Sequence, residues 1–160
     1  MFSLHHIFLK NQGGLLFDNL SLSFEDIGLV FLIGECTVNE SVFSFFFRPK
    51  EYTGKIVFNG RTVKKDSPGS VYNYKSAVAF QKTGSLNKER ISLSRIAIIL
   101  DDSADVFSEL AYLKSESLKR LVIVVSNNKE LAESVADKAY YYKGHNYEQV
   151  IGQKKCFSRL

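Results

Sequence analysis

The sequence predicts an α/β fold, with a parallel core sheet flanked by helices and an antiparallel β subdomain at the N-terminus. Three short runs, Leu29–Ile33, Ile96–Leu100 and Leu121–Val125, are continuously apolar. Such runs are typical of strands that are buried on both faces, as in parallel sheets. The segment Leu16–Phe24 instead alternates apolar and polar residues, which is typical of a half-buried antiparallel strand.

The N-terminal part of the chain is expected to contain a first strand, a turn and one helix. Apolar residues alternate between Phe2 and Leu9, and the polar turn Asn11–Gly14 ends this strand. After the first buried run come Gly34 and a loop, and then a helix from about Ser41 to Phe47.

The remainder of the chain is expected to alternate between strands and helices. Apolar residues at helical spacing, from Val106 to Leu113, predict a helix between the second and third buried runs. The other expected elements are a hairpin formed by Gly54–Phe58 and Gly60–Val63, a strand at Ser76–Phe80, a helix at Lys129–Ala136 and a strand at Lys138–Tyr142.

Length and composition indicate a single soluble domain over residues 1–160, with 45% hydrophobic and 24% charged residues. No apolar run approaches the roughly 18 residues that span a bilayer. We therefore expect a cytoplasmic protein, at most peripheral to the inner face of the membrane. The net charge is +4, but the basic residues are scattered and lack an aromatic-basic recognition pattern, so no nucleic-acid partner is expected.

Several segments follow one another in an informative order. A buried strand ends in two carboxylates at Ile96–Asp102 (IAIILDD), another ends in polar residues at Leu121–Asn128 (LVIVVSNN), and a short strand ends at Gln81. These segments resemble the Walker B strand, the strand before the switch histidine and the start of the Q-loop in ATP-binding-cassette (ABC) ATPase domains. Four further segments resemble that family: LFDNLSLSF (Leu16–Phe24), GKIVFNG (Gly54–Gly60), ERISLSR (Glu89–Arg95) and ADKAYYYKG (Ala136–Gly144). The resemblance implies a P-loop NTPase-like core sheet over nearly the whole chain.

The phosphate loop of this family follows the pattern G-x-x-x-x-G-K-[ST], and its place here is taken by GECTVNES. Gly34 and Ser41 match, but Asn39 replaces the second glycine and Glu40 replaces the lysine. Two like charges about 4 Å apart repel by roughly 4 kcal/mol at an effective dielectric near 20, about half of the binding free energy at micromolar affinity. We interpret the segment as a strand-to-helix turn required by the fold rather than as an anion-binding loop. Vestigial nucleotide positions are then Gly34, Asn39, Glu40, Ser41 and Gln81, and no cofactor is expected.

The resemblance also assigns the catalytic positions. Asp101 fits the Walker B aspartate, and a metal site formed by Asp101 and Ser41 is one interpretation. The other is that Asp101 and Asp102 are two solvated carboxylates at the end of a strand. Asp102 stands at the position of the glutamate that polarises water and is one methylene shorter, which makes it a weak catalytic candidate. Asn127 stands at the switch histidine and cannot exchange a proton near neutral pH, and Asn11 stands at the adenine-stacking aromatic.

Two regions of the family pattern are reduced or absent. The signature sequence falls at Thr83–Asn87 (TGSLN) without its two glycines in place, and Gln81 is followed almost at once by Ser85–Arg90. The helical subdomain that the family inserts here is therefore missing. Because that subdomain helps to form the permease-docking groove of the family, conventional transport coupling is not expected.

We therefore predict a degenerate ABC ATPase-like protein (a pseudo-ATPase) that acts as an interaction or regulatory subunit, with an ABC transporter as one assembly that it could join. Its partner would be a complete ABC ATPase subunit, a permease or a second copy of the chain. The alternative is an active subunit with an atypical site that binds and hydrolyses ATP with Mg²⁺. Phe43 and Phe45–Phe47 would serve either as a partner interface or as a fully buried helix.

Overall fold

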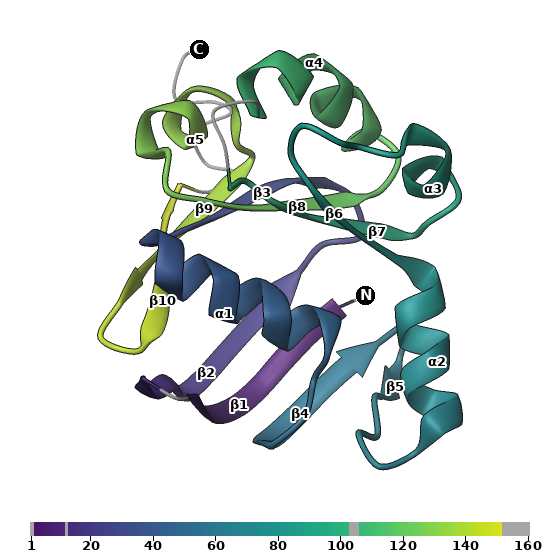
Figure 1. Ribbon diagram of the computed structural model, residues 1–160, viewed down its shortest axis with the longest axis vertical. Helices are drawn as coiled ribbons and strands as arrows, with labels where there is room; N and C mark the ends of the chain where they lie inside the picture. Colours follow the sequence, from purple (N-terminus) through teal and green to yellow (C-terminus); the bar gives the residue numbers. More distant parts are fainter. Residues whose placement is uncertain (1, 12, 103–105, 152–160) are drawn as a thin grey trace.

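The computed structural model describes residues 2–11, 13–102 and 106–151. It contains two sheets with one helix, α1 (Cys36–Phe47), lying between them. Figure 1 shows α1 below the larger sheet and above the smaller one, with three further helices on the opposite face of the larger sheet. The predicted α/β class, with its N-terminal antiparallel subdomain, is confirmed.

The smaller sheet is antiparallel and begins at the N-terminus, as the alternating pattern predicted. Its strands lie in the order β2-β1-β4-β5. The bounds are β1 (Phe2–Asn11), β2 (Gly14–Phe24), β4 (Tyr52–Phe58) and β5 (Arg61–Thr62). The buried side chains of these strands face α1, so this sheet forms one wall of the core.

The larger sheet has six strands in the order β10-β9-β3-β8-β7-β6. All neighbours are parallel except β10 and β9. The bounds are β3 (Gly28–Ile33), β6 (Val78–Lys82), β7 (Ile96–Leu100), β8 (Leu121–Ser126), β9 (Lys138–Lys143) and β10 (Asn146–Ile151). The three apolar runs thus form the central strands β3, β8 and β7, where both faces are covered.

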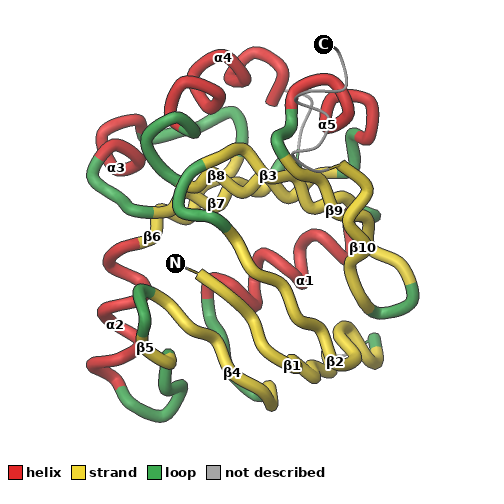
Figure 2. Tube along the Cα trace, turned by 180° about the vertical axis from the view of Figure 1, so that it is seen from behind, coloured by secondary structure: helices red, strands yellow, loops and turns green. Residues whose placement is uncertain are grey.

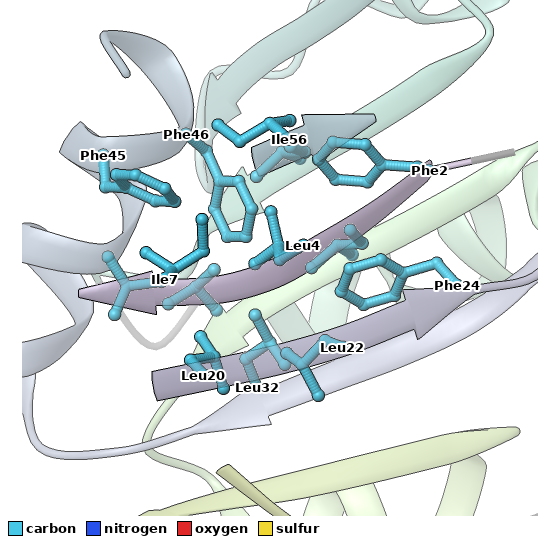
Figure 3. Packing of buried hydrophobic residues seen from close by; sticks show 14 of the residues in the cluster. Phe2, Leu4, Ile7, Leu20, Leu22, Phe24, Leu32, Phe45, Phe46 and Ile56 are labelled. Carbon is cyan, nitrogen blue, oxygen red and sulfur yellow. The ribbon is translucent and has the colours of Figure 1, made fainter. Parts of the chain in front are cut away.

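Each central strand supplies side chains to two separate cores, because successive side chains of a strand point to opposite faces. In β3, Val30 and Leu32 join the inner cluster around α1, whereas Leu29 and Phe31 join the outer cluster below the other helices. Figure 3 shows Leu32 together with Phe45 and Phe46 of α1 and residues of β1 and β2 in the inner cluster. The inner cluster is rich in aromatic rings, and the outer cluster is mostly aliphatic.

The outer face of the larger sheet carries the helices α3 (Lys88–Ser92), α4 (Val106–Glu116) and α5 (Lys129–Val135). Figure 2 shows these helices together on one side, with α2 (Pro68–Ala77) set apart beside β4 and β5. Within residues 83–95, which connect β6 to β7, α3 is the one helix, so no helical subdomain stands between the two strands. None of the helices in the described parts of the chain is long and apolar enough to cross a membrane.

The structure corrects two of the expected elements in their boundaries. Residues Ser76 and Ala77 end helix α2, and β6 starts at Val78, so the strand expected at Ser76–Phe80 is displaced. The helix expected from about Ser41 begins at Cys36. Strand β10 and helix α2 are both additions to the predicted set. The helices expected around 106–113 and 129–136, and the strand expected from Lys138, are confirmed.

The two expectations for the phenylalanines after Gly34 each hold for part of the set. Phe45 and Phe46 are buried in the inner cluster, with 4% and 1% of their surface exposed. Phe43 and Phe47 are half-buried, and both rings contact the ring of Phe80 on β6 edge-on, at centroid distances of 6.2 and 5.2 Å.

Candidate functional site

The predicted site residues gather where the central strands of the parallel sheet end. Gly34 follows β3, Asp101 follows β7, and Asn127 follows β8. The Gly34 N–H donates to the Ser126 carbonyl at 3.1 Å, and the Asp101 N–H donates to the Val125 carbonyl at 2.8 Å. Because parallel strands bring their carboxyl ends to one edge, these three positions share one edge of the sheet, where ligands bind in open α/β folds.

The Asp101 carboxylate is held by hydroxyl groups. Ser126 is fully buried and donates from Oγ to one carboxylate oxygen at 2.7 Å, and Thr83 lies 3.4 Å from the other. Ser126 Oγ in turn accepts from the Asn128 N–H at 3.0 Å. Asp102 is exposed. The first carboxylate is therefore oriented by its neighbours, and the second faces solvent.

The segment that aligns with the phosphate loop is mostly helical. Only Gly34 and Glu35 separate β3 from α1, which begins at Cys36. The Asn39 N–H donates to the Glu35 carbonyl at 2.9 Å, which closes the first helical turn. Asn39, Glu40 and Ser41 consequently belong to α1 instead of a loop, and we name residues Gly34–Ser41 the turn segment.

Asn39 anchors the turn segment from within. Its side chain is buried, with 2% exposed, and Nδ2 donates to the Gly34 carbonyl at 2.8 Å. Its Oδ1 has no hydrogen-bond partner among the described residues. A Cβ added at Gly34 would lie 3.1 Å from that oxygen and 3.4 Å from Cβ of Tyr142, so the position is tight for any larger residue.

Ser41 and Glu40 face away from the strand ends. Ser41 Oγ accepts from Asn11 Nδ2 at 3.0 Å, across to strand β1 of the smaller sheet. The two predicted metal ligands, Ser41 and Asp101, therefore hydrogen-bond to different neighbours. Glu40 is exposed and lines a shallow groove of about 440 Å³ with Asn11, Ser41 and Arg48. Among the described residues, no group of three or more His, Cys, Asp or Glu side chains is placed to hold a metal.

The two remaining predicted positions contact local partners. Asn127 Nδ2 lies 3.4 Å from Sγ of Cys36, so the switch position rests against the start of α1. Gln81 Oε1 accepts from the Asn87 N–H, across the loop that follows β6. The carboxyl ends of the parallel strands thus bring Gly34, Asp101 and Asn127 together. Ser41 and Gln81 instead form hydrogen bonds with Asn11 and Asn87.

Sequence reasoning missed the helical start of the turn segment and the whole of α2. The signal for α2 was present: Ser67 followed by Pro68 is a helix-start pattern, with serine at the N-cap and proline at the first helical position. The signal for α1 was weaker, since the N-cap residue Glu35 makes no side-chain capping bond. The alignment with the phosphate-loop pattern therefore predicted a loop at the residues where α1 begins.

The chain is a mixed α/β fold in which α1 follows the central parallel strand β3 and an antiparallel sheet lies beside the parallel one. No family model and no curated protein sequence matches the chain.

Solved structures of ABC transporter ATP-binding subunits do share its fold. One is described as cbiO1 from Clostridium perfringens, part of the ABC transporter complex cbiONQ. It has a TM-score of 0.73 at 9% identity and covers 98% of this chain and 90% of that one. A second, described as the ATP-binding subunit of an ABC transporter, has a TM-score of 0.72 at 11% identity and covers 94% and 90%. The likeness to both structures is a shared fold.

Proposed function

We propose that the chain is a non-catalytic ABC ATPase-like protein that acts by binding a partner protein. The observation that carries this proposal is the helical turn segment. A phosphate loop holds phosphates with backbone N–H groups that point into the loop. In this chain the Asn39 N–H donates to the Glu35 carbonyl at 2.9 Å, within the first turn of α1. Asn39 Nδ2 donates to the Gly34 carbonyl. Both donors are therefore engaged within the turn segment.

The charge of the turn segment supports the same proposal. Glu35 and Glu40 are both exposed at the start of α1, where a nucleotide of this family would place its phosphates. A carboxylate and a phosphate about 4 Å apart repel by roughly 4 kcal/mol at an effective dielectric near 20. The lysine of the phosphate-loop pattern, which would offset this repulsion, is replaced by Glu40. The segment therefore does not fit a bound nucleoside triphosphate.

The surrounding positions do not fit Mg²⁺ and ATP either. Ser41 Oγ, the expected metal ligand of the loop, is bonded to Asn11, which also stands where the family stacks the adenine ring. Asn11 offers an amide instead of an aromatic face. Asn127 cannot act as a proton-transfer group at the switch position.

A partner surface is supported by the half-buried aromatic rings beside β6. Phe47 is flanked by the cations of Lys75 and Arg48, at 4.3 and 5.7 Å from its ring centroid, and contacts Phe80. Aromatic residues and arginine are enriched at protein–protein interfaces. A complete ABC ATPase subunit, a permease or a second copy of this chain are the partners that the fold suggests.

Titration calorimetry of the purified chain with ATP and Mg²⁺, up to millimolar concentrations, tests the proposal. We expect no heat and no thermal stabilisation from the turn segment, so any saturable ATP signal of the natural chain should be unchanged in the variant Ser41→Ala. The double variant Asn39→Gly, Glu40→Lys restores two positions of the phosphate-loop pattern and should gain measurable binding. The variant Glu148→Lys makes the same charge change at an exposed position on β10 and should not gain it.

The active-subunit alternative rests on one feature, the Asp101 carboxylate held by Ser126 and Thr83 at the strand ends. Saturable binding by the natural chain, followed by release of inorganic phosphate that Asp101→Asn abolishes, would establish that alternative and overturn the proposal. Sedimentation velocity of the chain alone then tests whether the partner is a second copy.

A further inference from the structure

A second cleft lies away from the turn segment, between the β4–β5 hairpin and helix α2. Its volume is about 860 Å³, within the range of small-molecule sites. The hairpin contributes Arg61, the following loop contributes Lys64 and Ser67, and Ser70 and Asn73 come from α2. We name this the hairpin cleft.

All the charged residues that line the hairpin cleft are cations. They are Arg61, Lys64 and Arg95, and no aspartate or glutamate is among the lining residues. All three are exposed. Within the described parts of the chain, none of the three takes part in a salt bridge. A concave surface that gathers charge of one sign concentrates counter-ions of the opposite sign.

Arg95 also faces a second, smaller hollow. Glu25 and Asp26 line that hollow with Arg95 and Phe58. Part of the Arg95 charge is therefore balanced from the far side. Arg61 and Lys64 do not line that hollow. These two side chains therefore supply most of the positive electrostatic potential in the hairpin cleft.

The hydroxyl groups of the hairpin cleft are arranged to donate. Ser67 Oγ accepts from the Ser70 N–H at 3.4 Å, and Ser70 Oγ accepts from the Lys64 N–H at 2.8 Å. Among the described residues neither hydroxyl donates a hydrogen bond, so both hydroxyl hydrogens are available to a ligand. The side-chain amide of Asn73 makes no hydrogen bond among the described residues and offers two more donors.

We propose that the hairpin cleft binds a small molecule that carries two or more phosphate groups. Phosphate oxygens accept hydrogen bonds from guanidinium, ammonium and hydroxyl donors, and arginine binds them in bidentate geometry. The cations come from β5, the loop after it and the residue before β7. Charges distributed over three segments suit a ligand with separated anionic groups better than a single phosphate ion.

This site is independent of the proposed function, because it shares no residue with the turn segment. The two ideas can fail separately. Because ATP itself carries three phosphates, ATP binding that the double variant Arg61→Gln, Lys64→Gln removes belongs to the hairpin cleft. ATP binding that this variant retains would overturn the pseudo-ATPase proposal alone, and an empty hairpin cleft leaves that proposal unaffected.

Calorimetric titration of the natural chain with inorganic pyrophosphate tests the proposal, followed by amide NMR of the labelled protein. We expect saturable binding with a dissociation constant below about 1 mM, weakened as salt rises. The amide signals that shift should be those of Thr62, Lys64, Ser70 and Asn73. Orthophosphate at equal ionic strength should bind at least about tenfold more weakly.

Matched variants locate the site. The double variant Arg61→Gln, Lys64→Gln should weaken pyrophosphate binding at least about tenfold. The double variant Lys55→Gln, Lys119→Gln removes the same charge at exposed positions outside the cleft and should leave the affinity within about twofold. Thermal melts of both variants verify folding. No saturable binding, equal weakening by both double variants, or shifts centred on Cys36–Ser41 would each overturn the proposal.

Discussion

The two sides of α1 differ in how completely their buried polar groups are paired. On the side of the hairpin cleft, the Tyr74 hydroxyl is buried and donates to the Phe46 carbonyl at 2.9 Å. On the side of the turn segment, the two buried atoms Asn39 Oδ1 and the Tyr147 hydroxyl lack a partner among the described residues. Tyr147 lies next to Tyr142, at a centroid distance of 5.5 Å, and Tyr142 in turn contacts the Gly34 position.

The two sides of α1 therefore differ in whether their buried polar atoms have hydrogen-bond partners. A buried polar atom without a partner costs on the order of 1–3 kcal/mol, and most proteins avoid it away from functional positions. Asn39 Oδ1 lies where the sequence departs from the phosphate-loop pattern, and the Tyr147 hydroxyl lies on β10. The paired Tyr74 hydroxyl lies beside a cleft that no part of that pattern describes. The buried polar atoms without a partner among the described residues therefore lie on the side of the turn segment, and the side of the hairpin cleft has its buried Tyr74 hydroxyl paired.

The largest loss of stability should come from a substitution in the inner cluster, which packs against both sides of α1. Phe46 is 1% exposed and its ring lies 5.9 Å from that of Phe2 and 5.6 Å from that of Phe45. Figure 3 shows it pointing from α1 towards Leu4. The variant Phe46→Ala should lower the free energy of unfolding by about 3–5 kcal/mol, because it removes buried surface and leaves a cavity.

Urea denaturation at neutral pH measures this loss. Phe47→Ala is the matched control on the same helix, because Phe47 is half-buried, and it should cost less than half as much. If the two variants were equally destabilised, the inner cluster would not be the shared support of both sides.

Alkaline pH should produce the next largest effect. Burial raises the pKa of Tyr74 and of Tyr147 well above the ordinary tyrosine value. The folded chain thus keeps both phenols protonated where the unfolded chain releases its protons. Their contribution to stability is complete below about pH 10 and is lost as pH rises toward the folded-state pKa values.

The free energy of unfolding should therefore fall by about 1.4 kcal/mol per pH unit for each of these tyrosines above about pH 10. Urea denaturation at a series of pH values from 9 to 11 gives the slope. Tyr72→Phe at a position that is 70% exposed should leave the slope unchanged. A slope that neither Tyr74→Phe nor Tyr147→Phe reduces would contradict the assignment.

Much of the fold follows from the sequence because strands and their order are encoded by repeated local patterns. The runs at Leu29–Ile33, Ile96–Leu100 and Leu121–Val125 became the central strands, since apolar side chains on both faces suit only a covered parallel sheet. Helix α2 was less visible, because its apolar residues are few and Tyr74 is its one buried residue. Strand β10 was missed because its burial pattern has Tyr147 as its one buried side chain.

The site was less predictable because its geometry depends on tertiary hydrogen bonds. The positions of Gly34, Asp101 and Asn127 at one sheet edge followed from the strand pattern. The bond from Asn11 to Ser41 joins residues of different sheets, and no local pattern encodes it. Likewise, the bond from Asn39 to the Gly34 carbonyl appears only once α1 begins at Cys36, which the alignment with a loop pattern concealed.

The smallest effect is also the sharpest test of the difference between the two sides. Tyr147→Phe removes a hydroxyl that has no hydrogen-bond partner among the described residues. Burying the phenol oxygen costs free energy that no bond returns, so the variant should be as stable as the natural chain or more stable by up to about 1 kcal/mol.

Tyr74→Phe is the matched substitution on the other side. It removes the donor to the Phe46 carbonyl, which lies in the last turn of α1, where helix carbonyls lack partners within the helix. The loss should be about 1–2 kcal/mol. Urea denaturation of both variants at pH 7, where every tyrosine is protonated, isolates the hydrogen bond from the ionisation effect. If Tyr147→Phe cost as much as Tyr74→Phe, the hydroxyl of Tyr147 would have a partner in solution, and the two sides of α1 would be equally well satisfied.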